Sequence, residues 1–81
     1  MAYLQERITI TEIQGHKITP PLQVDLTEED KRHYATANEI DPFLVGKGTT
    51  PESAQGNLEK AIAEKPGLIE EMKRNGRLNP A

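Results

Sequence analysis

The sequence predicts a small α+β domain in which a three- or four-stranded, mainly antiparallel sheet precedes two helices that pack on one of its faces. Short β-branched and alternating segments fill the first two-thirds of the chain, and helical spacing of apolar residues follows only after residue 50. Glycine and proline separate the segments. Strands that all precede the helices are typical of an α+β domain.

The small size of the chain limits how stable a single copy can be. It has 81 residues, of which 35% are hydrophobic. A domain of this length buries only about 60% of the surface that its unfolded chain exposes. Self-association adds buried surface, so we expect a homodimer.

Composition excludes several chemistries and locations. The chain has no cysteine, which excludes disulfides, thiolate zinc sites and a cysteine nucleophile. No apolar run approaches the length of a membrane span, and the N-terminus does not follow a basic region with an apolar one. We therefore expect a cytoplasmic protein with no membrane partner. The net charge of −3 disfavours a broad nucleic-acid-binding face.

The first predicted strands form a hairpin. Residues 7–13 alternate between β-branched and polar types, residues 14–15 (Gln-Gly) suit a turn, and residues 16–19 form a short return strand. Residues 20–21 are both proline and have no N–H to donate. We expect them to stop the ladder.

The middle of the chain contains the other predicted strands and their connections. The predicted segments are residues 22–26 as a strand, 27–33 as a solvated polar loop, 34–40 as a weak strand, 41–42 (Asp-Pro) as a turn, and 43–45 as a short apolar run that residues 46–48 (Gly-Lys-Gly) terminate.

Two helices complete the fold. Thr50 is the expected N-cap of the first because Pro51 suits the first helical position. A competing register makes Thr49 the cap, with Glu52 reaching back to it. Pro66 must end this helix by residue 65. Its apolar stripe is Ala54, Leu58, Ala61 and Ile62.

The second helix is shorter. It is predicted over residues 66–74, with Leu68, Ile69 and Met72 on its apolar side. Gly76 suits the left-handed position that follows a helix. Residues 77–81 are expected to be a tail.

Taken in order, these segments resemble the HicB-like antitoxins of bacterial and archaeal toxin–antitoxin pairs. The similar stretches are residues 22–26 as the first family strand, 28–33 as its polar turn, 34–37 (Tyr-Ala-Thr-Ala) opening the second strand, 40–42 as the next turn, 45–54 as the most recognisable stretch, 57–62 continuing it, and 71–80 as the charged helix end with its glycine and proline. The chain departs from the family at His33, where glycine is usual, and at residues 53, 55 and 56 in the first helix. Residues 1–19 have no counterpart and are interpreted as an N-terminal arm or hairpin before a HicB-like α+β module at 20–81.

The resemblance implies a partly formed ribonuclease-H-like sheet and a function without catalysis. Such modules neutralise a small basic toxin that cleaves mRNA, and they commonly form dimers. Full-length antitoxins append a DNA-binding segment for which this chain leaves no room after the second helix, so we do not expect direct DNA binding. The alternative is a stand-alone structural or regulatory domain that uses the same scaffold and has no toxin partner.

Candidate chemical sites have simpler structural interpretations. Residues 46–50 (Gly-Lys-Gly-Thr-Thr) lack the full P-loop pattern and are expected to form a tight turn, with weak anion binding left open. Asp25, Glu39 and Asp41 could converge on metal ions in a nuclease, but solvated surface acids explain them more simply. His16 and His33 are expected to be ordinary exposed side chains. We assign no catalytic, cofactor-binding or metal-ligating residue.

Charged groups and the first strand suggest contacts with partners. The cations at 31–32, 73–74 and 77 are too few for strong phosphate binding, and those near the second helix favour its dipole. The acids at 28–30 and 70–71 are expected to be solvated, although they could face a basic toxin. The run 8–10 (Ile-Thr-Ile) is predicted to cover a sheet edge or to pair with a neighbouring copy.

Overall fold

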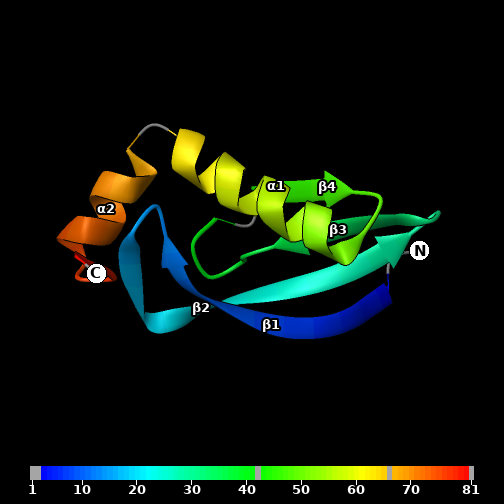
Figure 1. The fold of residues 1–81 in the computed structure, drawn as a ribbon, viewed down its shortest axis with the longest axis horizontal. Coiled ribbons are helices and arrows are strands. Elements are labelled where there is room, and N and C mark those ends of the chain that lie inside the picture. The colour runs from blue at the N-terminus through cyan, green and yellow to red at the C-terminus, as the bar shows by residue number, and fades with distance from the viewer. Residues whose placement is uncertain (1–2, 42, 66, 81) are drawn as a thin grey trace.

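A computed structural model describes residues 3–41, 43–65 and 67–80, and over these residues five strands form one antiparallel sheet with two helices on one face (Figure 1). This arrangement confirms the predicted α+β class. The elements are β1 (Tyr3–Ile13), β2 (His16–Glu29), β3 (Arg32–Thr36), β4 (Val45–Gly48), α1 (Pro51–Glu64), α2 (Leu68–Arg74) and β5 (Leu78–Pro80). Strands β1 to β4 lie side by side in chain order, and β5 pairs with the beginning of β2.

The first hairpin turns where the sequence predicts. Gln14 and Gly15 have φ angles of 49° and 76°, and two successive positive φ angles are the mark of a type I′ hairpin turn. Ile13 and His16 pair across it. The strand before the turn starts at Tyr3, earlier than the predicted residue 7, because β2 is long enough to pair with the whole of it.

The prediction that residues 20–21 stop the ladder is wrong for β2, which runs through both prolines. The pairing with β1 is nevertheless interrupted: Ile10 pairs with Leu22 and Glu12 with Lys17, so that β2 has several more residues than β1 between these pairs. The prolines cannot donate to β1. They interrupt the ladder without ending the strand.

The C-terminal segment pairs with β2 beside this interruption, so the predicted tail is wrong over the described residues. Gly76 has a φ of 77°. Its N–H donates to the carbonyl oxygen of Lys73 (3.1 Å), and the N–H of Arg77 donates to the carbonyl oxygen of Met72 (2.8 Å). These bonds form a Schellman cap, which reverses the chain. Leu78 is then buried at 5% exposure and pairs with Ile18.

The predicted polar loop at 27–33 is a second hairpin. β2 continues to Glu29 and β3 starts at Arg32, which leaves only Asp30 and Lys31 in the turn, with φ angles of 50° and 64°. By strand alternation Thr27 and Glu29 lie on the face opposite buried Leu26, whereas Glu28 and His33 lie on the same face as Leu26 and are half-buried. The polar residues of this segment therefore form paired strands, and only Asp30 and Lys31 lie in the turn between them.

Glycine in β4 has a packing role, which corrects the prediction that residues 46–48 end a strand. Gly46 is buried in the strand directly under α1. A Cβ at this position would lie 2.1 Å from the carbonyl oxygen of Ala54 and 2.3 Å from the amide nitrogen of Leu58. The absence of a side chain lets the helix backbone approach the sheet. β3 is also shorter than predicted and ends at Thr36.

The first helix begins and ends as predicted. The Thr50 hydroxyl accepts the N–H of Ser53 (3.1 Å), and the Ser53 hydroxyl accepts the N–H of Thr50 (3.1 Å). This reciprocal capping box confirms the Thr50 register. The helix ends at Glu64 with Lys65 as C-cap, and α2 starts at Leu68. Pro66, predicted to end the first helix and to start the second, lies outside the described residues.

The core lies between the sheet and the helices. The predicted apolar stripe of α1 packs into it, although Ala61, one of its four residues, is only half-buried. The described buried apolar residues are Ile10, Ile13, Ile18, Leu22, Val24, Leu26, Ala35, Ala37, Ala54, Leu58, Ile62, Leu68, Met72 and Leu78.

Candidate functional site

Phe43 is the most exposed large apolar side chain among the described residues, at 90% exposure. It lies in the loop between β3 and β4, and Val45, two residues later, is 36% exposed. Leu44 between them is partly buried and packs against the core. In the sequence, all three form one apolar run. Only the fold separates the residue that points away from the core.

The backbone around Phe43 is held by Asp41. This residue is buried, and its Oδ1 accepts the N–H of Phe43 (2.9 Å). Its Oδ2 accepts a hydrogen bond from the ammonium group of Lys65, the C-cap of α1. The backbone N–H of Asp41 donates to the carbonyl of Ala37 (3.2 Å), and the backbone N–H of Leu44 donates to the carbonyl of Asp41 (3.3 Å). Phe43 is therefore presented by a hydrogen-bonded turn.

The electrostatics of this turn favour the charged carboxylate. The hydrogen bond from Lys65 lowers the pKa of Asp41 below its ordinary value, and the Phe43 N–H lowers it further. Burial opposes these two effects. Asp41 is ionised at neutral pH and keeps both oxygens engaged.

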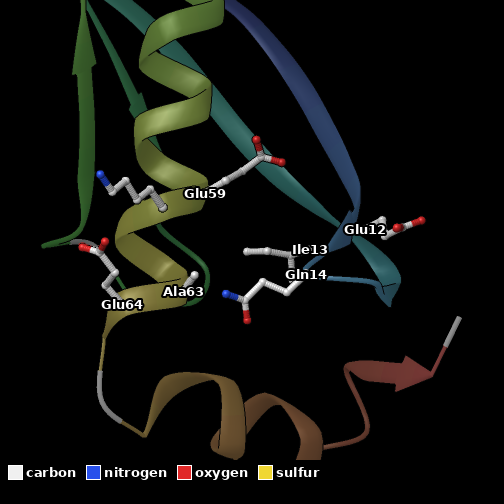
Figure 2. Close-up of a pocket in the computed structure, with 7 residues that line it drawn as sticks. Glu12, Ile13, Gln14, Glu59, Ala63 and Glu64 are labelled. Carbon is white, nitrogen blue, oxygen red and sulfur yellow. The ribbon is translucent and has the colours of Figure 1, made fainter.

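A groove of about 490 Å³ lies between the tip of the first hairpin and α1 (Figure 2). Ile13 and Gln14 point from the hairpin toward the helix, and Glu59 and Ala63 lie on the helix side that faces them (Figure 2). The charged residues that line the groove are Glu12, Glu59, Lys60 and Glu64. Three of these four side chains are acidic, and the apolar residues of the lining are Ile13 and Ala63.

The three carboxylates weighed for a nuclease do not form one site. The guanidinium of Arg7 donates to Asp25 (3.0 Å), and that of Arg77 donates to Glu39 (2.9 Å), whereas Asp41 bonds Lys65. A shallow hollow brings Asp25 and Glu39 together with Arg7, but Asp41 does not line it. Within residues 3–41, 43–65 and 67–80, no three acidic or histidine side chains are grouped to hold a metal ion.

Both histidines are half-buried, where the sequence predicts exposed ones. The His16 Nδ1 lies 3.2 Å from the carbonyl oxygen of Gln14, beside the first turn. The His33 Nε2 lies 3.8 Å from a carboxylate oxygen of Glu28, and the His33 side chain is 14% exposed. Each ring is positioned by its own hairpin.

The cations have separate surroundings. Lys73 and Arg74 occupy the last turn of α2, as predicted, and the Lys73 ammonium lies 3.6 Å from a carboxylate oxygen of Glu70. Arg77 instead donates to the carbonyl of Pro20 (3.1 Å) and to Glu39, which ties β5 to the rest of the sheet. Local sequence patterns do not predict these contacts, because they join residues far apart in the chain.

The remaining predicted contact groups belong to β2, to β4 with the two residues after it, and to α2. Glu28 and Glu29 are half-buried strand residues rather than loop acids, whereas Glu70 and Glu71 are exposed on the first turn of α2. Of residues 46–50, Lys47, Gly48 and Thr49 line a small hollow together with Arg32. Glu28 and Gly48 both pair with His33 of β3, so these two groups lie in one row of the sheet, whereas Glu70 and Glu71 belong to α2.

Comparison with known proteins leaves the resemblance to HicB-like antitoxins as a matter of sequence pattern alone. No family model, curated protein or solved structure matches the chain. In the part of the chain that the structure describes, neither helix has the length and apolar character needed to cross a membrane.

Proposed function

We propose that this chain is a non-enzymatic protein-binding module and that Phe43 is its anchor. The observation that carries the proposal is the 90% exposure of Phe43 on a turn held by buried Asp41. Large aromatic side chains contribute strongly to binding when they enter a partner's pocket. A backbone that is already ordered loses little entropy on binding.

The partner that we propose is a small basic RNA-cleaving toxin, as the resemblance to HicB-like antitoxins implies. The net charge of −3 and the acidic groove beside α1 support a basic partner, because complementary charge speeds encounter and disfavours wrong partners. Inhibition would occur by occlusion, with the module covering the RNA-binding and catalytic face of the toxin. Since the toxin acts on mRNA, the proposed location is the cytoplasm.

The test is affinity purification of the tagged chain from its native host, followed by mass spectrometry and an RNA-cleavage assay on any protein recovered. We expect one small basic ribonuclease in equal amount, inhibited by the wild-type chain. Phe43→Ala should weaken inhibition by about 10-fold or more, as truncation of an anchor does, and Phe43→Leu should retain most of it. Circular dichroism should show that both variants fold.

Two outcomes would contradict the proposal. Recovery of no partner other than copies of the chain would favour a stand-alone structural or regulatory domain. Recovery of a ribonuclease that Phe43→Ala inhibits as well as the wild type does would remove Phe43 as the anchor.

A further inference from the structure

A hollow of about 250 Å³ opens where β3 begins and β4 ends. Its lining residues are Arg32, Lys47, Gly48 and Thr49. His33 pairs with Gly48, which places Arg32 level with Thr49, one residue further along each strand. Two segments that are separate in the chain therefore meet here, and each contributes a cation.

Strand alternation puts both cations on one face of the sheet. Lys47 pairs with Tyr34, and Arg32 lies two residues before Tyr34 in β3. Successive side chains of a strand point to opposite faces, so these cations project away from the face on which Gly46 lies under α1. Diagonal neighbours on adjacent antiparallel strands have Cα atoms about 7–8 Å apart. Two long side chains at this spacing can reach one ligand.

Both cationic groups are free of ion pairs in the part of the chain that the structure describes. Arg32 and Lys47 are exposed, and the ion pairs of the described residues join other side chains. The acid nearest in register is Glu29, the pairing partner of Arg32 across the β2–β3 turn, but it does not line the hollow. The two turn residues, Asp30 and Lys31, carry opposite charges and lie outside it as well. The hollow therefore has a positive balance in a chain whose net charge is −3.

The second cation distinguishes this hollow from the motif in the sequence. Residues 46–50 (Gly-Lys-Gly-Thr-Thr) contain one cation and lack the full P-loop pattern. The pairing of β3 with β4 adds the guanidinium of Arg32 beside that lysine. Arg32 supplies a planar fork of N–H donors, Lys47 a mobile ammonium group and Thr49 a hydroxyl. Donors of these three kinds fit an oxyanion that has several oxygens.

We propose that this hollow binds a dianionic phosphate, either free or as the terminal group of a phosphate monoester. This inference is independent of the proposed toxin partner. A monoester phosphate carries about −1.5 to −2 charges at pH 7 and three strong acceptor oxygens, which match two cations and a hydroxyl. Arg32 binds two of the oxygens side by side, and Lys47 and Thr49 contact the third. A carboxylate or a phosphodiester carries a single negative charge and leaves one of the two cations unneutralised.

Nuclear magnetic resonance titration of the full chain with sodium phosphate tests the site. At about pH 7.5 and a constant ionic strength of about 0.15 M, we expect saturating shifts of the Gly48 and Thr49 amides and of the Arg32 Nε–H, with a dissociation constant of roughly 1–10 mM. Sodium acetate and dimethyl phosphate, which carry a single charge, should bind at least about 3-fold more weakly. Methyl phosphate distinguishes the two sources: tighter binding than inorganic phosphate indicates a monoester ligand, and weaker binding indicates the free ion.

Single substitutions test the named side chains. Arg32→Gln and Lys47→Gln each remove one cation and should raise the dissociation constant for phosphate at least about 3-fold. Glu29→Gln removes the acid opposite Arg32 and should lower this constant by about 2-fold. Lys60→Gln is the matched control, because Lys60 is also exposed but lines the separate groove beside α1. Its dissociation constant should stay within about 1.5-fold of the wild-type value, and circular dichroism should show that all four variants fold.

Three outcomes would overturn the proposal. The first is amide shifts that rise linearly with phosphate and do not saturate. The second is an equal loss of affinity in Lys60→Gln and Lys47→Gln, which would show a general effect of net charge. The third is equal binding of acetate, dimethyl phosphate and inorganic phosphate, which would exclude a preference for a dianion.

Discussion

Lys65, at the end of α1, hydrogen-bonds the buried carboxylate of Asp41, whose other oxygen accepts the N–H of Phe43. The two bonds connect the helix to the loop that carries the proposed anchor. Since Lys65 is 24 residues from Asp41 in the chain, this connection exists only once α1 has packed on the sheet. The position of Phe43 thus depends on the tertiary fold.

The Asp41–Lys65 pair predicts an acid-sensitive contribution to stability. The pKa of Asp41 is lower in the folded chain than its ordinary value of 3.8, so the folded state favours the ionised form. This contribution is complete above that ordinary value and is lost as the pH falls through the lower folded pKa. Asp41→Asn should therefore be less stable than the wild type at pH 7, with the difference shrinking below about pH 4. Urea unfolding followed by circular dichroism across this range checks it, and a difference independent of pH would contradict it.

Two glycines of the chain should respond to alanine in opposite ways. Gly46→Ala places a methyl group against the backbone of α1, and we expect a loss of about 1–3 kcal/mol in the free energy of unfolding. Gly56 lies inside α1 with open space around it, so Gly56→Ala should gain about 0.5–1 kcal/mol from helix propensity. Urea unfolding of both variants measures the effects. A neutral Gly46→Ala would show that α1 does not approach the sheet this closely.

The capping box of α1 predicts a third effect. Thr50→Ala removes the hydroxyl that accepts the Ser53 N–H and should lower the free energy of unfolding by about 1 kcal/mol. Thr50→Ser keeps an acceptor and should lie within a few tenths of a kcal/mol of the wild type. Thermal unfolding of the three proteins compares them, and equal losses for both variants would argue against the cap.

The C-terminal segment should be part of the folded core. Leu78→Ala removes a side chain that is buried at 5% exposure, and we expect a loss of about 2–4 kcal/mol. The exposed neighbour Asn79 is the control, because Asn79→Ala should change stability by less than about 0.5 kcal/mol. Similar free energies of unfolding for the two variants, measured with urea, would show that this segment is not part of the folded core.

Local chemistry accounts for the parts of the fold that could be predicted. The Thr50 cap, the turn at residues 14–15 and the left-handed Gly76 each depend on a few neighbouring residues, and all three are found in the structure. The stripe of Ala54, Leu58 and Ile62 depends only on helical spacing, and it is buried. A residue pattern within one segment was sufficient for each of these features.

Most of the features that could not be predicted depend on residues distant in the chain, whereas the hairpin at 27–33 pairs near neighbours such as Glu28 and His33. Residues 27–33 look like a loop until their strands pair, and Leu78 looks like part of a tail until β2 offers it a partner. Gly46 looks like a terminator until α1 lies above it. The exposure of Phe43 and the hollow beside Arg32 and Lys47 follow from the same packing. Propensity acts over a few neighbouring residues, whereas burial and most strand pairing are set by which distant segments meet. The candidate site depends on burial and pairing, and therefore on the tertiary structure.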